Sequence, residues 1–157
     1  MKFAHEIITF QNGETKDNGW WELDGDYLYN VCGGRHVFCS DELAEIIEAE
    51  SWPDFYEKHA RKIFLKPNSP YGWLSPSGEF FGCSHTGHQN LATYFFKSSE
   101  RELENNGYIK ISAEPFGCNL QTYYSKDFIS ENQKIWLEKN GFVEEDLGVW
   151  FKREEKC

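Results

Sequence analysis

The chain has 157 residues, of which 39% are hydrophobic and 17% aromatic, so it can bury a core and is not a disordered segment. It contains 26 acidic and 16 basic side chains, and a chain this acidic lacks the basic surface that neutralises nucleic-acid phosphates. The first ten residues hold no apolar stretch that resembles a signal peptide, and no run is long enough to span a membrane. With an odd number of cysteines, these features predict a reduced, cytoplasmic protein.

Two stretches of the chain, 19–44 and 72–92, resemble each other. Each begins with a Gly-Trp pair and continues, at the same offset, with a glycine before an acidic residue, Gly25 in the first and Gly78 in the second. A Leu-Ala pair follows in both. The pattern predicts an internal duplication of a unit made of a hairpin, a helix and a strand. Because Gly-Trp pairs and glycine turns are common, chance similarity explains the pattern equally well.

In the first half, Ser40 predicts the start of a helix, since a serine hydroxyl accepts a hydrogen bond from the first turn of a helix. The buried stripe of this helix would consist of Leu43, Ile46 and Ile47. Ser51 followed by Pro53 predicts a second, shorter helix. The segment 62–65 is predicted to be the strand that closes the first unit.

The segment 66–70 is rich in Pro, Asn and Ser and marks the seam between the halves. After it we predict a hairpin, a helix over 89–97, and a helix that Ser99 and Glu102 begin as a capping box. A strand over 108–111 closes the second unit. Ser130 and Gln133 predict another capping box, and 149–151 a last strand.

The expected fold class is therefore α+β. It comprises two small hairpin–helix–strand units, followed by a C-terminal hairpin, helix and strand. The expected domains are an acidic N-terminal unit, 1–65, and a C-terminal unit, 66–157, packed on it.

The second half also has a recognisable series of motifs. It contains Tyr71-Gly72-Trp73-Leu74-Ser75-Pro76-Ser77-Gly78-Glu79, then Gly87-His88-Gln89-Asn90 and Asn106-Gly107-Tyr108-Ile109-Lys110-Ile111. Over residues 66–142 this resembles an uncharacterised small domain found in phage and mobile-element proteins of Gram-positive bacteria. The resemblance implies a small accessory protein of such an element. Many proteins of that setting regulate the element or block host defences, as anti-CRISPR inhibitors do.

Six cysteines and histidines form two closely spaced sets: Cys32, His36 and Cys39 in the first half, and Cys83, His85 and His88 in the second. Thiolates and imidazoles are ligands that zinc prefers, but neither set has the spacing of a standard zinc knuckle. Cys83 beside a histidine would also suit a thiol enzyme. The alternative, which we favour, is that Cys32 and Cys83 are small buried hydrophobic residues and that His36 and His88 lie in turns or caps. We therefore predict no metal, no cofactor and no catalytic residue.

Negative charge is concentrated in the first half, where residues 1–65 include 13 acidic and 6 basic side chains. On the helix predicted from Ser40, acidic residues three apart would share one face. A solvated face explains this arrangement, and so does a surface complementary to a basic partner protein. For the second interpretation the predicted partner-binding residues are Glu42, Glu45, Glu48, Asp54, Glu57 and the aromatic anchor Trp52.

These features together predict a non-enzymatic accessory protein of a phage or mobile element. It would bind, and inhibit or regulate, a host defence protein that has a basic nucleic-acid-binding surface. The alternatives are a small zinc- or thiol-dependent enzyme and a small ligand-binding module. A homodimer is also compatible with this aromatic-rich composition.

Overall fold

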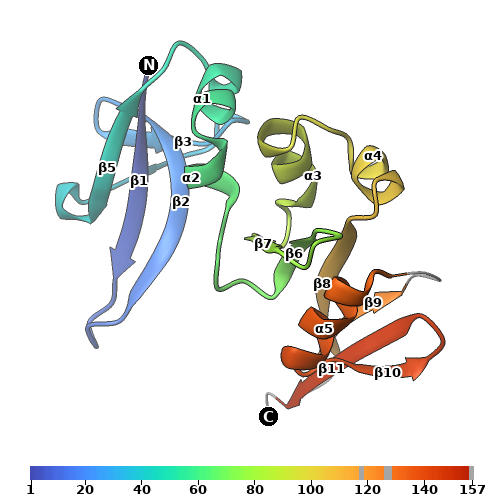
Figure 1. The fold of residues 1–157 in the computed structure, drawn as a ribbon. Coiled ribbons are helices and arrows are strands. Elements are labelled where there is room, and N and C mark those ends of the chain that lie inside the picture. Colours follow the sequence, from blue (N-terminus) through green and yellow to red (C-terminus); the bar gives the residue numbers. More distant parts are fainter. Residues whose placement is uncertain (117–118, 126–128, 156–157) are drawn as a thin grey trace. The chain divides into compact units, whose positions relative to one another are not determined.

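The computed structural model describes residues 1–116, 119–125 and 129–155. The chain divides into two compact units, 1–63 (unit 1) and 64–157 (unit 2) (Figure 1). Each unit is built on an antiparallel sheet, and the helices are short, with at most nine residues in the described ranges. The α+β fold class of hairpin–helix–strand units is therefore wrong, because the described chain is mostly β. None of its helices has the length and apolarity that crossing a bilayer requires.

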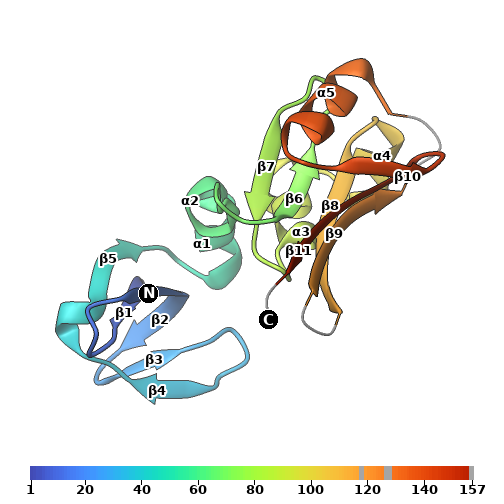
Figure 2. The same cartoon turned by 90° about the horizontal axis from the view of Figure 1, so that it is seen from below.

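Unit 1 contains a five-stranded sheet in the order β4-β3-β2-β1-β5. Its strands are β1 (Lys2–Thr9), β2 (Thr15–Asp24), β3 (Tyr27–Tyr29), β4 (Arg35–Val37) and β5 (Leu43–Glu48). Figure 2 shows β4 at one edge of this sheet and β5 at the other. Between β2 and β3 the two-residue loop begins with Gly25 at φ 61°, a conformation in which glycine has no steric penalty.

Helix α1 (Trp52–Lys58) covers part of one face of the unit 1 sheet. The Ser51 hydroxyl accepts a hydrogen bond from the Asp54 amide and caps the helix, which confirms the helix start predicted from the sequence. Phe55 is fully buried and stacks on Phe3 of β1 with ring centroids 4.2 Å apart. Trp20 of β2 contacts the edge of the same Phe55 ring. These aromatic contacts form the core between α1 and the sheet.

The helix predicted from Ser40 does not form. A single 3₁₀ turn, η1 (Ser40–Glu42), leads directly into β5. The segment Leu-Ala-Glu-Ile-Ile-Glu fits both helical and strand periodicity, and its pairing with β1 decides the outcome, with Ile47 opposite Phe3. Along β5 the side chains alternate between half-buried and exposed, so Ile46 is 50% exposed instead of lying in a buried stripe.

The predicted internal duplication is also wrong beyond the two hairpins. Gly25 and Gly78 both lie in hairpin loops with positive φ, but the first loop has two residues, 25–26, and the second has five, 75–79. After its hairpin, however, the first half continues into strands β4 and β5, and the second half into helices. The closing strand predicted over 62–65 lies mostly within helix α2 (Ala60–Phe64). The two units therefore have different topologies.

Unit 2 contains a six-stranded sheet in the order β10-β11-β9-β8-β6-β7. Its strands are β6 (Tyr71–Leu74), β7 (Phe80–Cys83), β8 (Ile109–Phe116), β9 (Asn119–Ser125), β10 (Val143–Asp146) and β11 (Val149–Glu155). Its helices are α3 (His88–Asn90), the π-helix η2 (Leu91–Phe95), α4 (Glu100–Asn105) and α5 (Glu131–Lys139). The predicted helix over 89–97 and the strands at 108–111 and 149–151 are thus confirmed in outline.

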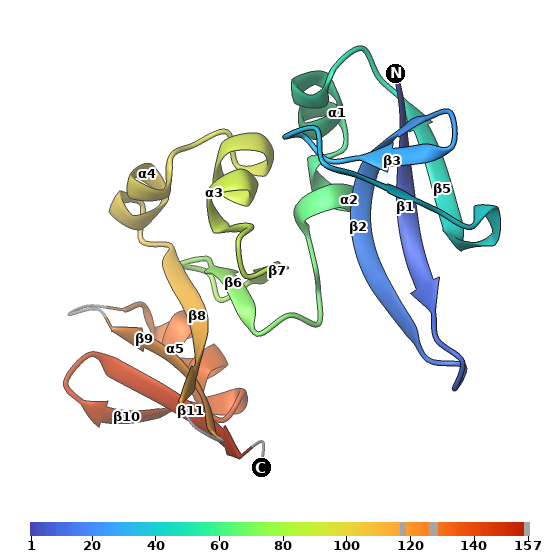
Figure 3. The same cartoon turned by 180° about the vertical axis from the view of Figure 1, so that it is seen from behind.

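Adjacent residues of β6 belong to two separate cores, because successive side chains of a strand point to opposite faces. Trp73 packs with Leu91 and Leu103 from the α3–η2–α4 segment, and Leu74 packs with Leu137 of α5. Figures 2 and 3 show α5 on one face of this sheet and α3 and α4 on the other. The sheet of unit 2 is therefore covered on both faces around β6.

Gln133 of α5 bonds to three other parts of unit 2, and the residue is 1% exposed. Its amide donates to the carbonyls of Gly107 at 2.7 Å and Leu74 at 3.3 Å. Its Oε1 accepts from the Ser130 amide, and the Ser130 hydroxyl accepts from the Gln133 amide. The capping box predicted for these two residues is thereby confirmed.

Candidate functional site

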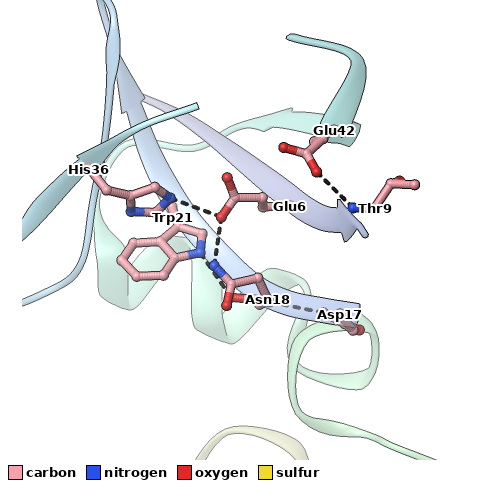
Figure 4. Close-up of polar contacts among 8 residues, drawn as sticks. Glu6, Thr9, Asp17, Asn18, Trp21, His36 and Glu42 are labelled. Atoms are coloured by element: carbon pink, nitrogen blue, oxygen red, sulfur yellow. Dashed lines mark hydrogen bonds and ion pairs between the residues drawn. The ribbon is translucent and has the colours of Figure 1, made fainter. Parts of the chain in front are cut away.

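A polar cluster in unit 1 surrounds Glu6 of β1, a residue that is 2% exposed (Figure 4). Its Oε1 accepts hydrogen bonds from Asn18 Nδ2 at 2.6 Å and from His36 Nε2 at 2.9 Å. Since a carboxylate only accepts, both nitrogens must donate. The Trp21 indole donates to the Asn18 backbone carbonyl at 2.9 Å, and its ring contacts the His36 ring edge-on at 4.5 Å. Below, "the Glu6 cluster" means Glu6, Asn18, Trp21 and His36.

Irregular strand pairing places Glu6 in this position. The register of β1 shifts at Glu6 against β2 on one side and against β5 on the other. On β2 the shift leaves Asn18 and Gly19 opposite Glu6, and Gly19 has φ 84°. Such bulges bend a strand and redirect its side chains. Here the bend directs the Asn18 amide toward the Glu6 carboxylate.

The bond between Glu6 and His36 also shows that the sheet curls. The two residues belong to β1 and β4, which are separated by β2 and β3. In a flat sheet these strands would lie about 14 Å apart, yet the side-chain atoms are 2.9 Å apart. The Glu6 cluster therefore lies on the concave side of the sheet and fixes the edge strand β4 in place.

A carboxylate bonded to a histidine can orient a catalytic base. Within the described residues, the ring and hydrogen-bond contacts of His36 are to Glu6 and Trp21, so no hydroxyl, thiol or amine nucleophile is bonded to it. We therefore interpret the Glu6 cluster as a structural clamp. His5 and Asp17 form a second carboxylate–histidine pair at 2.7 Å, in which the His5 ring stacks on Trp20.

Most of the predicted partner-binding residues take part in contacts within unit 1. Glu42 accepts a hydrogen bond from the Thr9 amide at 2.7 Å, and Glu45 forms an ion pair with Lys62 at 2.5 Å. Trp52 is half-buried and packs edge-on against Phe3. The helical face predicted to carry these acidic residues does not form, because Glu45 and Glu48 lie on strand β5.

Asp54 and Glu48 lie beside positive charges. Asp54 accepts from the Glu50 amide at 3.0 Å and pairs with Lys58 at 3.2 Å. The hydrogen bond from Glu50, and then the Lys58 ammonium, lower the pKa of Asp54 below its ordinary value. Glu48 lines a shallow groove together with Lys2, Lys58 and Asp54. This groove therefore contains both acidic and basic side chains. Glu57 on α1, the last of the predicted partner-binding residues, is exposed.

The cysteines and histidines do not support the enzyme alternatives. Cys83 is fully buried, and burial raises the pKa of its thiol to about 12, so it is not a nucleophile at neutral pH. His88 is also buried, its Nε2 bonds to the Ile111 carbonyl at 3.0 Å, and burial lowers its pKa. Cys32, Cys39 and His85 are exposed. Among the described residues, no three His, Cys, Asp or Glu side chains form a metal-binding group.

Sequence reasoning missed Glu6, Asn18 and Trp21 as a unit. The partners of Glu6 lie 12 and 30 residues away in the chain, so no local motif joins them. One signal was present: a glutamate within the apolar segment Phe-Ala-His-Glu-Ile-Ile requires a partner if that segment is a buried strand.

The chain is similar to the side tail fiber protein pb1 of Escherichia phage T5, with 24% identity over 121 residues. The match takes in 76% of this chain and 9% of that protein, so the chain spans a small part of its relative's length. Because the match is longer than either unit, it includes residues of both. No family model matches the chain, and no solved structure matches it. The similarity associates the chain with phage proteins.

Proposed function

We propose that this chain is a non-catalytic binding module of a phage, and that unit 1 binds a partner protein with a basic surface. The observation behind the proposal is the charge of unit 1. Residues 1–63 contain the 13 acidic and 6 basic side chains counted above for the first half, a formal charge of −7. A surface with this excess steers the approach of a basic protein.

The similarity to a phage tail fibre protein supports the assignment to a phage. The resemblance of residues 66–142 to a domain of phage and mobile-element proteins agrees with this assignment, but that resemblance itself stays a prediction. Inhibition of a host defence protein with a nucleic-acid-binding surface also stays a prediction. The proposal retains the charged partner from that hypothesis, but not the acidic helical face.

The proposal is tested with the purified full chain, immobilised and exposed to an extract of phage-infected bacteria. Retained proteins are identified by mass spectrometry, purified and titrated against the chain at low and high salt. We expect a basic protein that binds with a dissociation constant in the micromolar range or below, and at least about tenfold more weakly at 300 mM than at 50 mM salt. A binding constant independent of salt, or no protein that binds the purified chain, would contradict the proposal.

A second candidate is a structural role in the phage tail, which the tail fibre similarity favours. Mass spectrometry of purified virions distinguishes the two. Peptides of this chain in the virion, in a fixed ratio to the tail proteins, indicate the structural role. Peptides found only in infected-cell extract indicate the accessory role.

A further inference from the structure

One face of the β2–β3–β4 ribbon combines aromatic, aliphatic and charged side chains. Directly opposite residues of antiparallel strands lie on the same face. The pairing places Asp24, Tyr27 and Val37 in one cross-strand row, and Glu22, Tyr29 and Arg35 in the next. Below, "the β4 patch" means these six residues.

The β4 patch continues the face that α1 covers. Phe3 pairs with Glu22, and α1 packs on Phe3 and Trp20 through Phe55. At the β4 end of the same face the side chains are open, since Val37 is 69% exposed and Arg35 is also exposed. The apolar side chains of this face are thus buried near β1 and accessible near β4.

Its composition is that of a protein interface. Tyr27 and Tyr29 are half-buried, with ring centroids 6.3 Å apart, and the Arg35 guanidinium lies 4.4 Å from the centre of the Tyr27 ring. Tyrosine and arginine are enriched at protein interfaces and among the residues that dominate binding energy. Rings held by neighbouring side chains lose little conformational freedom when a partner binds.

The charge at its rim indicates which partner it fits. Glu22 and Asp24 form no ion pair within the described residues, and Asp26 in the adjoining turn is also exposed and unpaired there. The one cation of the patch, Arg35, contacts Tyr27. The rim is therefore negative around an apolar and aromatic centre, which is complementary to a basic protein surface.

We infer that the β4 patch is the surface through which unit 1 docks onto a basic partner protein. This inference rests on the proposed function and names its contact surface. It also replaces the acidic stretch from Glu42 to Glu57, much of whose charge is engaged within unit 1.

The first test locates the contact by photo-crosslinking in the extract of infected bacteria. The photoreactive residue p-benzoylphenylalanine replaces either Val37 or Ile46. The two are matched, since both are exposed β-branched residues on opposite edge strands of one sheet. We expect a basic protein to be crosslinked from position 37 and not from position 46. A second copy of this chain as the adduct, or equal yields from both positions, overturns the inference.

The second test titrates the crosslinked protein, once purified, against charge-reversal variants. Asp24→Lys alters the patch rim, and Glu48→Lys is the matched control, an equal charge change at an exposed residue of β5. We expect Asp24→Lys to weaken binding at least about tenfold and Glu48→Lys less than about threefold. An equal loss of affinity in the two variants would refute the β4 patch as the contact surface, but not the proposed function. Failure of the unsubstituted chain to bind any basic protein overturns the proposed function itself.

Discussion

Replacing Glu6 by alanine should destabilise unit 1 strongly, because it removes the shared acceptor of Asn18 and His36. Glu6 is 2% exposed and Asn18 is half-buried, so the Asn18 amide would lose its partner with little access to water, whereas the His36 side chain is 34% exposed and is partly resolvated. An unsatisfied buried donor costs about 1–3 kcal/mol, and a hydrogen bond to a charged group contributes about 1.5–3 kcal/mol. We therefore expect a loss of about 3 kcal/mol in the free energy of unfolding of unit 1, or about 12 °C or more in its melting temperature.

The assay must separate the two units, since their unfolding need not be one transition. Hydrogen–deuterium exchange with mass spectrometry along a urea series does so, because peptides from 1–63 and from 64–157 are followed separately. Glu6→Gln keeps the shape and an acceptor oxygen, and should cost about 1 kcal/mol. Glu14→Ala, an exposed glutamate between β1 and β2, is the control and should change little. Equal urea midpoints for Glu6→Ala and Glu14→Ala would refute the clamp.

Three further predictions concern other parts of the chain. The lowered pKa of Asp54 stabilises unit 1 above pH 3.8, and this stability is lost as the pH falls through the pKa of the folded state. Asp54→Asn should therefore lower the urea midpoint of unit 1 at pH 7. The difference from the unsubstituted chain should shrink toward pH 2. Burial raises the pKa of the Cys83 thiol to about 12. Iodoacetamide at pH 8 should therefore alkylate the exposed Cys32 at least about 100-fold faster than Cys83, measured by peptide mass spectrometry. Equal alkylation rates at the two cysteines would contradict this prediction. Gln133→Ala should destabilise unit 2 by about 3 kcal/mol, because the carbonyls of Gly107 and Leu74 and the amide of Ser130 each lose a hydrogen bond that contributes about 1 kcal/mol. Lys134→Ala, on the exposed side of α5, should leave the urea midpoint of unit 2 nearly unchanged.

Elements with local signals were predictable from the sequence. Ser130 and Gln133 lie three residues apart, and their capping box depends only on the first turn of α5, so the spacing is sufficient to predict it. Ser51 and Asp54 mark the start of α1 in the same way. The segment 43–48 has no such signal. Its state depends on β1, which is more than 30 residues earlier in the chain, and its pairing with Phe3 overrides the helical periodicity.

The candidate site was less predictable for the same reason. The sequence shows how many carboxylates unit 1 has, but not which cations or amides lie near each of them. Glu45 lies in the acidic segment of the sequence, and in the structure it pairs with Lys62, 17 residues away. Asp24 is the last residue of β2, and it forms no ion pair within the described residues. Local charge counts therefore give the acidic excess of unit 1, but not which of its carboxylates form ion pairs.

Strand alternation connects the Glu6 cluster to the β4 patch. β4 has three residues, and His36 at its centre turns inward to Glu6, so Arg35 and Val37 must point outward. The hydrogen bond between His36 and Glu6 thus also fixes the position of the outer face of β4. Loss of binding and loss of stability should therefore separate. Asp24→Lys alters only the outer face, and it should weaken partner binding and leave the urea midpoint of unit 1 unchanged. Glu6→Ala removes the hydrogen bond that holds β4, and it should lower both the affinity for the partner and the urea midpoint.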